Sequence, residues 1–282
     1  MRPLAIRFFS LVIFLVCYLS WYSNAQENSN TLKIAGHRGG YYHTYPESSL
    51  SLFGFIAKQF HSDTITVELD LRRSLDGTIY IMHDETIDRT TNGHGGIDQQ
   101  KDSYLSSLYL KKQNGQLTTE RIPTFEQVLT FIKPTNINLM LDIKTDVFQE
   151  AIDLVKKNGL EGRMIVLTFN IGLTKKMASL SDKVMLSSLV ETESDWLQFS
   201  DVTIPQNRKI AYINSKTPGS LLQELKRNRI NVMTDLSEAL RNSGKPLANK
   251  DYQAFVKENL LDILITDFPI EARKALSDQL VH

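Results

Sequence analysis

The chain has 282 residues, of which 41% are hydrophobic and 23% are charged, as in an ordinary globular protein. Its 32 Lys and Arg balance its 32 Asp and Glu, which excludes a global field that attracts nucleic acid or anionic membranes. No basic run, low-complexity tract or repeat of solenoid period is present. The length fits one or two domains, and a closed α/β barrel uses about 250 residues as a single unit.

Residues 1–25 have the pattern of a secretory signal peptide. MRPLAIR carries two positive charges, FFSLVIFLVCYL is a short apolar core, and SNA before Gln26 has the form of a cleavage site. A membrane anchor is the alternative, although a span needs about 20 apolar residues. Bulky Val16 disfavours a lipoprotein anchored at Cys17. We expect cleavage after Ala25, no stable membrane insertion, and export to the periplasm or the extracellular space.

Short β-rich runs alternate with helical patterns along the rest of the chain. The helical patterns include 48–60, 124–133 and 219–228, and Thr124 with Gln127 predicts an N-terminal capping box for the second. The β-rich runs occupy 32–37, 65–71, 78–83, 137–144, 164–169, 184–190, 230–236 and 262–268, with a weaker run at 201–205.

This alternation predicts an α/β fold, a (β/α)₈ TIM-type barrel forming a single domain after the signal peptide. A doubly wound open sheet is the alternative. It is disfavoured because no glycine-rich phosphate loop follows the first β-rich run.

Two of the β-rich runs carry acidic residues where a buried parallel strand should be apolar. In TVELDL, Glu68 and Asp70 are two residues apart, so both side chains point to one face. In NLMLDIK, Asp142 and Lys144 share a face in the same way. Because the outer face of a barrel meets apolar helices, we expect these acids to point inward near the carboxyl ends of the strands.

Adjacent buried carboxylates repel one another, and each costs several kcal/mol to desolvate unless it is compensated. A divalent cation would compensate the acids, and ligands that are all oxygen favour Mg²⁺, Ca²⁺ or Mn²⁺ over zinc. A surface strand with solvated charges is the alternative, which explains one such strand more easily than two.

His37 and His83 both end β-rich runs, which in a barrel is the face where active sites are built. A single terminal histidine is commonly a satisfied polar residue, but a pair suits a general acid and a general base. Arg38 offers a guanidinium fork for phosphate oxygens, and Lys144 offers a compact positive charge. Together with the acids, these residues indicate metal-assisted catalysis on a phosphate ester.

Several blocks resemble those of glycerophosphodiester phosphodiesterases, in the same order and spacing, from about residue 33 to residue 270. They read GHRGG…PESSL, VELDLRRSLDGTIYIMHDETIDRTTNGHG, RIPTFEQVL, LDIK and ILITDFP. The resemblance implies a TIM-type barrel at 32–275 that hydrolyses glycerophosphodiesters to glycerol 3-phosphate and an alcohol. It also implies one divalent cation, Ca²⁺, Mg²⁺ or Mn²⁺, and a small-molecule substrate.

The resemblance carries over to site residues by position. Glu47 belongs to a Pro-Glu-Ser motif beside the site, where it either touches the site or caps the following helix. Met233 stands where shorter bacterial members often have Trp, which affects the pocket for the glycerol or the leaving group. The implied sets are catalytic His37 and His83, phosphate-binding Arg38 and Lys144, and the metal ligands Glu68, Asp70 and Asp142.

Two other functions are weighed against this one. A phospholipase D-like or cyclising phosphodiesterase acting on phospholipids would need an exposed apolar lip, and no amphipathic loop is evident in the sequence. A non-catalytic phosphodiester-binding protein of the cell envelope would have no need for two histidines together with three acids.

Overall fold

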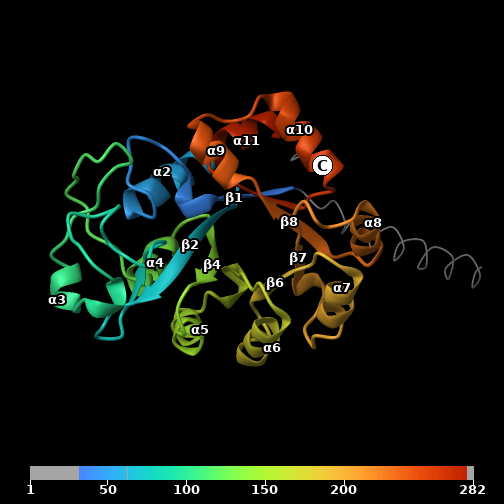
Figure 1. Ribbon diagram of the computed structural model, residues 1–282, viewed down its shortest axis with the longest axis horizontal. Coiled ribbons are helices and arrows are strands. Elements are labelled where there is room, and N and C mark those ends of the chain that lie inside the picture. The colour runs from blue at the N-terminus through green and yellow to red at the C-terminus, as the bar shows by residue number, and fades with distance from the viewer. Residues whose placement is uncertain (1–31, 62, 278–282) are drawn as a thin grey trace, which may run out of the picture.

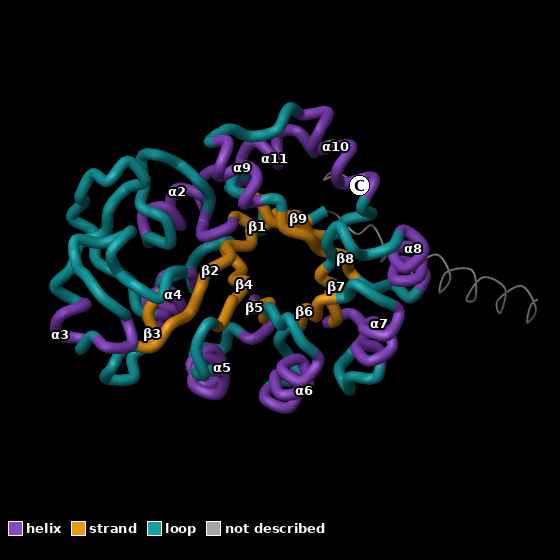
Figure 2. The backbone as a smooth tube through the Cα atoms, in the orientation of Figure 1, coloured by secondary structure: helices purple, strands orange, loops and turns teal. Residues whose placement is uncertain are grey.

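The computed structural model describes residues 32–61 and 63–277, so the predicted signal peptide at 1–25 lies outside the described residues. Eight of the nine strands in this part of the chain form a parallel barrel, which the pairing of β1 with β2 closes (Figure 2). The predicted (β/α)₈ barrel is therefore confirmed. The barrel strands are β1 (Lys33–Gly36), β2 (Ile65–Arg73), β4 (Ile137–Ile143), β5 (Met164–Val166), β6 (Met185–Leu189), β7 (Lys209–Tyr212), β8 (Asn231–Asp235) and β9 (Ile263–Thr266).

Helices surround the barrel (Figure 1). Across residues 32–61 and 63–277, none of them has the length and hydropathy needed to cross a bilayer. The helices are α2 (Leu50–Phe60), α3 (Asp102–Leu105), α4 (Phe125–Ile132), α5 (Phe148–Lys157), α6 (Ile171–Leu180), α7 (Glu193–Ser200), α8 (Gly219–Arg227), α9 (Ser237–Ser243), α10 (Asn249–Glu258) and α11 (Pro269–Ala275). Short 3₁₀ turns occur at His37–Gly39, Ile97–Gln99, Glu161–Arg163 and Gln206–Arg208.

Alternation along the strands divides the core into two layers. In β4, Leu139 and Leu141 pack outward against the helices, whereas Met140 points into the barrel. The interior layer consists of a few apolar side chains, among them Met140 and Ile265 of β9. These apolar side chains therefore fill the barrel interior. Polar side chains on the same strand faces follow them toward the carboxyl ends of the strands.

Helices α2 and α4 begin close to the positions that the sequence predicts, and capping side chains stabilise both starts. The Ser49 hydroxyl accepts a hydrogen bond from the Leu52 amide at the start of α2. Thr124 and Gln127 form the predicted capping box of α4, and each side chain accepts a hydrogen bond from the other residue's amide.

The prediction that 78–83 is a barrel strand is wrong. Strand β3 (Ile79–Ile81) lies outside the barrel and pairs antiparallel with β2 through contacts such as Leu71 with Ile81. The physical reason is chain length, because the few residues that separate the two runs can close a hairpin but cannot make a parallel crossover. The connection is a tight turn in which Gly77 has a φ of +95°.

The predicted weak strand at 201–205 is also wrong, because this segment is a turn that follows α7. The sixth barrel strand is β7, which begins at Lys209. The Lys209 side chain is buried, and its ammonium donates to the carbonyls of Phe199 and Ser200 at the end of α7. A lysine thus occupies the first position of a buried strand, and this charge masks the strand in the sequence.

The long connection between β3 and α4 forms a lobe beside the barrel, seen at the left of Figure 2. The lobe has its own apolar cluster, in which Met82, Ile87, Ile97, Leu105 and Leu110 pack together. His83, near the start of this connection, lines the same cavity as His37.

Candidate active site

The first loop turns sharply after β1. Arg38 has a φ of +52°, a left-handed conformation that is costly for a residue with a Cβ. In this conformation the Arg38 amide donates to Oε2 of Glu68 at 2.9 Å. Gly39 and Gly40 follow with φ of +86° and +107°, and a Cβ on Gly40 would lie 2.6 Å from the Tyr42 ring. The His-Arg-Gly-Gly sequence thus places His37 and Arg38 over the barrel mouth.

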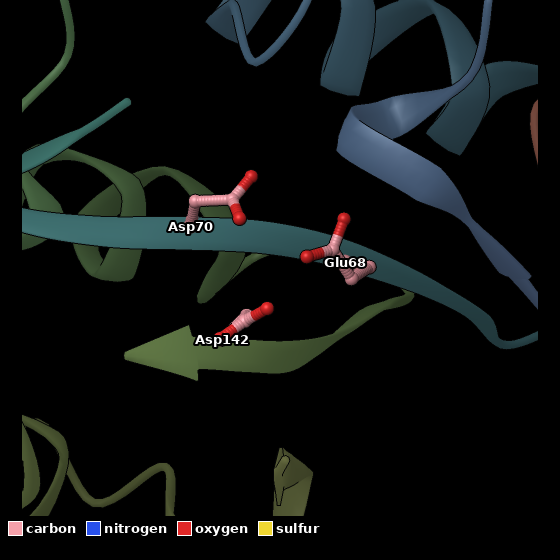
Figure 3. Close-up of side chains that lie close together, drawn as sticks. All are labelled: Glu68, Asp70 and Asp142. Atoms are coloured by element: carbon pink, nitrogen blue, oxygen red, sulfur yellow. The ribbon is translucent and has the colours of Figure 1, made fainter. Parts of the chain in front are cut away.

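Glu68, Asp70 and Asp142 gather above the interior layer (Figure 3). Asp70 and Asp142 are direct partners in the register of β2 and β4, and Glu68 precedes Asp70 on the same face. One ligand oxygen from each of the three lies within 4.8 Å of the others. Glu68 and Asp70 are buried, which excludes the alternative of a solvated surface strand.

The electrostatics of this cluster are unfavourable for three bare carboxylates. Burial and the neighbouring charge of Asp70 raise the pKa of Glu68 well above its ordinary value. Burial also raises the pKa of Asp142. Oδ2 of Asp70 is buried without a hydrogen-bond partner, so an acceptor is left that a cation would satisfy. The donor set, all carboxylate oxygen, therefore fits a hard divalent cation.

Lys144 offsets part of this negative charge. Its ammonium donates to Oδ2 of Asp142 and lies 3.3 Å from Oδ1 of Asp70. Although burial lowers the pKa of Lys144, the charges of Asp142 and Asp70 together raise it above its ordinary value. Lys144 therefore carries a full positive charge at the edge of the cluster.

His37 is oriented by a residue from the other end of the chain. Its Nδ1 lies 3.0 Å from Oδ1 of Asp267, which follows β9. Because a carboxylate only accepts hydrogen bonds, Nδ1 carries the proton and Nε2 faces the acids, 4.0 Å from Oε2 of Glu68. The ring nitrogen that remains for proton transfer is thus Nε2.

His83 is oriented in the same way by its neighbour Asp84. Its Nδ1 lies 2.7 Å from Oδ1 of Asp84, and its carbonyl accepts a hydrogen bond from Nε of Arg72. Arg89 donates to both oxygens of Asp84. These hydrogen bonds lower the pKa of Asp84, although burial opposes them, so it remains an anionic acceptor for His83.

Glu47 accepts hydrogen bonds from arginines near both histidines. Arg89 donates to both of its oxygens at 2.8 Å, and Arg38 and Arg241 donate at 3.3 Å and 3.4 Å. Although burial raises the pKa of Glu47, the three guanidinium groups lower it to about 2. Glu47 does not cap α2, because Ser49 does so. Arg241 also donates to Asp267 at 2.6 Å.

A cavity of about 160 Å³ brings the predicted residues together. It is lined by His37, Arg38, Glu68, Asp70, His83, Asp142 and Lys144. Glu47 does not line this cavity, but it accepts a hydrogen bond from Arg38, which does. Met233 is fully buried in the interior layer, and aromatic lining comes instead from Phe169 and Tyr212, whose rings meet edge to face.

Sequence reasoning did not identify Asp267, Asp84, Arg89 or Arg241 as site residues. A signal for Asp267 was present, because it follows Ile263 and Ile265 on the inward face of β9. Asp84 is adjacent to His83, and adjacency alone could have indicated it. Arg241 had no local signal, because it meets Glu47 across 194 residues of sequence.

Comparison with known proteins agrees with this geometry. Residues 37–271 match the glycerophosphoryl diester phosphodiesterase family. The glycerophosphodiester phosphodiesterase of Caldanaerobacter subterraneus subsp. tengcongensis is 32% identical over 158 residues, which cover 52% of this chain and 63% of that protein. The matched region thus spans less than two thirds of that relative's length.

Solved structures show the same barrel. A glycerophosphoryl diester phosphodiesterase from Parabacteroides distasonis superposes with a TM-score of 0.76 at 25% identity, covering 89% of this chain and 88% of that one. A phosphodiesterase from Oleispira antarctica in complex with the product sn-glycerol-3-phosphate shares the fold, with a TM-score of 0.66 at 19% identity, covering 88% and 98%. With a match that runs from His37 into the first turn of α11, this chain belongs to the glycerophosphoryl diester phosphodiesterase family, a family of phosphoric diester hydrolases.

Proposed function

We propose that this protein hydrolyses glycerophosphodiesters to glycerol 3-phosphate and an alcohol, with His37 and His83 as the general acid and base and one divalent cation as cofactor. The observation that carries the proposal is the pairing of both imidazoles with carboxylates at Nδ1 around one cavity. This pairing leaves two Nε2 atoms for proton transfer beside a cluster of three acids.

Glu68, Asp70 and Asp142 would hold the cation, which is Ca²⁺, Mg²⁺ or Mn²⁺ by the chemistry of the donors. Two observations support this assignment: Oδ2 of Asp70 accepts no hydrogen bond, although Nε of Arg38 lies 3.9 Å away, and the acids repel one another. When bound, such an ion supplies positive charge that offsets the negative charge of phosphoryl oxygens.

The chain's own residues bind the phosphate and move the protons. Arg38 and Lys144 line the cavity and neutralise phosphoryl charge. One histidine removes a proton from the nucleophile as the nucleophile's oxygen bonds to phosphorus. The nucleophile is either water or the neighbouring glycerol hydroxyl, and in the second case water must then open the cyclic phosphate to give glycerol 3-phosphate. The other histidine donates a proton to the alcohol oxygen as the bond between that oxygen and phosphorus breaks. Asp267 and Asp84 keep the two rings oriented throughout.

A metal-supplemented assay across several glycerophosphodiesters, with glycerol 3-phosphate release as the readout, tests the proposal. We expect turnover with Ca²⁺, Mg²⁺ or Mn²⁺, none in excess EDTA, and recovery when the cation is restored. Binding without turnover would contradict the proposal and favour a non-catalytic envelope protein. A cyclic phosphate as the final product, or faster turnover of phospholipid vesicles, would indicate one of the phospholipase-like alternatives.

We also propose that the protein acts outside the cytoplasm, in the periplasm or the extracellular space. The support is the signal-peptide pattern of residues 1–25, with its basic start, short apolar core and small residues before Gln26. Fractionation followed by N-terminal sequencing tests the proposal. A mature chain that begins at Gln26 in the exported fraction is expected, and a full-length chain retained in the cytoplasm would contradict it.

A further inference from the structure

A second, larger cavity of about 390 Å³ lies beside the candidate active site. Three parts of the chain form it: the first loop with Tyr41 and Glu47, the β3–α4 lobe from Arg89 to Gly115, and α9 with Arg241. Figure 1 shows these segments on one side of the barrel, where the lobe approaches the loop before α2. The cavity is therefore shaped by the tertiary fold and not by a single loop.

The lining of this cavity is strongly cationic. Arg89, Arg241, Lys111 and Lys112 contribute positive charge, and Glu47 is the carboxylate among the lining residues. The two arginines are already balanced, because Glu47, Asp84 and Asp267 accept their hydrogen bonds.

The two lysines have only neutral partners among the described residues. Nζ of Lys111 donates to the Asp88 carbonyl at 3.0 Å, and Nζ of Lys112 donates to the Gln116 side-chain oxygen at 3.3 Å. Both lysines are half-buried. The cavity therefore carries positive charge that the folded chain does not neutralise.

Unpartnered polar atoms add a second and independent indication of a ligand. Both side-chain polar atoms of Gln113 are buried without a hydrogen-bond partner, and so is Nε of Arg241. A buried amide or guanidinium nitrogen that makes no hydrogen bond is costly, and a bound water, ion or ligand can satisfy such an atom. Gln113 and Arg241 both line the cavity, Gln113 from the lobe and Arg241 from α9.

Two arginines of the cavity wall contact the aspartates that orient the two histidines. Its wall residue Arg89 contacts Asp84, which orients His83, and its wall residue Arg241 contacts Asp267, which orients His37. To reach the lysines, the alcohol portion of a diester whose phosphate lies between the two imidazoles would have to extend past these arginines.

We propose that this cavity binds a second oxyanion, a phosphate monoester or a carboxylate, carried on the alcohol portion of the diester. The chain would then select glycerophosphodiesters whose head group is anionic. This inference rests on the proposed function and deepens it, because it names the substrate class of the same site. Lysine ammonium groups supply the charge, and the Gln113 amide supplies an additional hydrogen bond.

Two matched substrate pairs test the proposal and separate the two sources of negative charge. Glycerophosphoinositol and its phosphorylated form differ by one phosphate monoester, and glycerophosphoethanolamine and glycerophosphoserine differ by one carboxylate. The measurement is kcat and KM for each member with the wild-type protein and with the double variant Lys111→Gln/Lys112→Gln. Lys175→Gln is the control, because this exposed lysine lies on α6, in another part of the fold.

In the wild-type protein we expect the anionic member of at least one pair to have the higher kcat/KM, by about tenfold, as one charge-assisted hydrogen bond would give. The double variant should lose this preference through a higher KM for the anionic member, with the kcat of the neutral member unchanged. Lys175→Gln should retain the preference. If the double variant does not fold, the two single variants provide the same comparison.

The outcomes distinguish this inference from the proposed function. The inference would be overturned, and the proposed function retained, if every diester were hydrolysed with no preference in either pair. An equal loss of kcat/KM for both members in the double variant would have the same meaning. If no diester is hydrolysed, the proposed function fails. Calorimetric binding of the same pairs then decides whether the cavity binds the anionic group. A lower Kd for the anionic member that depends on the two lysines would support the cavity's role, and equal values would overturn it.

Discussion

His37 and Asp267 are 230 residues apart in the sequence, and in the structure Nδ1 of the histidine lies 3.0 Å from Oδ1 of the aspartate. The aspartate is fully buried and also accepts a hydrogen bond from Arg241 at 2.6 Å. This contact connects the last barrel strand to the first loop. It determines which nitrogen of His37 faces the cavity.

Replacement of Asp267 by Asn should lower kcat by about 10²–10⁴-fold, because the neutral amide no longer stabilises the imidazolium or holds its Nδ1 proton. KM should change little, since Asp267 does not line the cavity. Asp146→Asn, an exposed position on the surface, is the control and should retain full activity. An equal change in kcat for both variants would show that Asp267 does not position His37.

His37→Ala and His83→Ala should each nearly abolish activity while the fold is retained, because each removes one of two proton transfers worth about 10²–10⁴-fold. His94→Ala is the matched control, since the His94 side chain is 81% exposed and pairs with Asp88 on the lobe. Circular dichroism and thermal unfolding would verify the fold of all three variants. If either cavity variant kept most of the wild-type turnover, the assignment of that histidine would be wrong.

Addition of Ca²⁺ or Mg²⁺ should raise the thermal unfolding midpoint of the wild-type protein. A ligand at a hundredfold excess over its Kd stabilises the folded state by about 2.7 kcal/mol. Glu68→Gln should remove most of this response, and its metal-free form should be at least as stable as the wild type because burial and Asp70 disfavour the Glu68 charge. Glu126→Gln, at an exposed site on α4, should keep the full response. An undiminished response in Glu68→Gln would exclude Glu68 as a ligand.

Glu47 should make stability depend on acidic pH. Its pKa is about 2 in the folded protein against an ordinary 4.5, so between these values the unfolded chain binds more protons. The stabilisation, about 3 kcal/mol by the size of the shift, is therefore present above pH about 4.5 and is lost as the pH falls toward 2. Urea unfolding at steps from pH 7 to pH 2.5 measures the effect.

Glu47→Gln is the comparison for this experiment. At pH 7 it should be less stable than the wild type by about 3–5 kcal/mol, because three guanidinium groups lose a buried carboxylate. The difference between the two proteins should shrink as the pH falls. Parallel curves over the whole range would show that the charge of Glu47 does not contribute to folding.

Much of the barrel and of its acidic cluster follows from local patterns. The two-residue alternation of β2 places Glu68 and Asp70 on one face, and the same rule applies to Asp142 and Lys144 in β4. Capping residues such as Thr124 act within one helical turn, so the start of α4 was also predictable.

Other features were not recognisable because their causes lie elsewhere in the fold. The strand that begins at Lys209 carries an ammonium group whose hydrogen bonds are accepted at the end of α7, by the Phe199 and Ser200 carbonyls. The hairpin position of β3, by contrast, has a local cause, because the connection from β2 is too short for a parallel crossover.

The sequence by itself determined which side chains β2 and β4 present on their inward faces, because the two-residue period of a strand is a local property of the backbone. It also indicated a phosphate-ester site, because His37, Arg38 and the three acids are residue types that suit that chemistry. Only the tertiary structure decided how the histidines are held. Asp267 meets His37 and Arg241 meets Glu47 because closing the barrel brings the last strand beside the first, and no spacing along the chain records that contact.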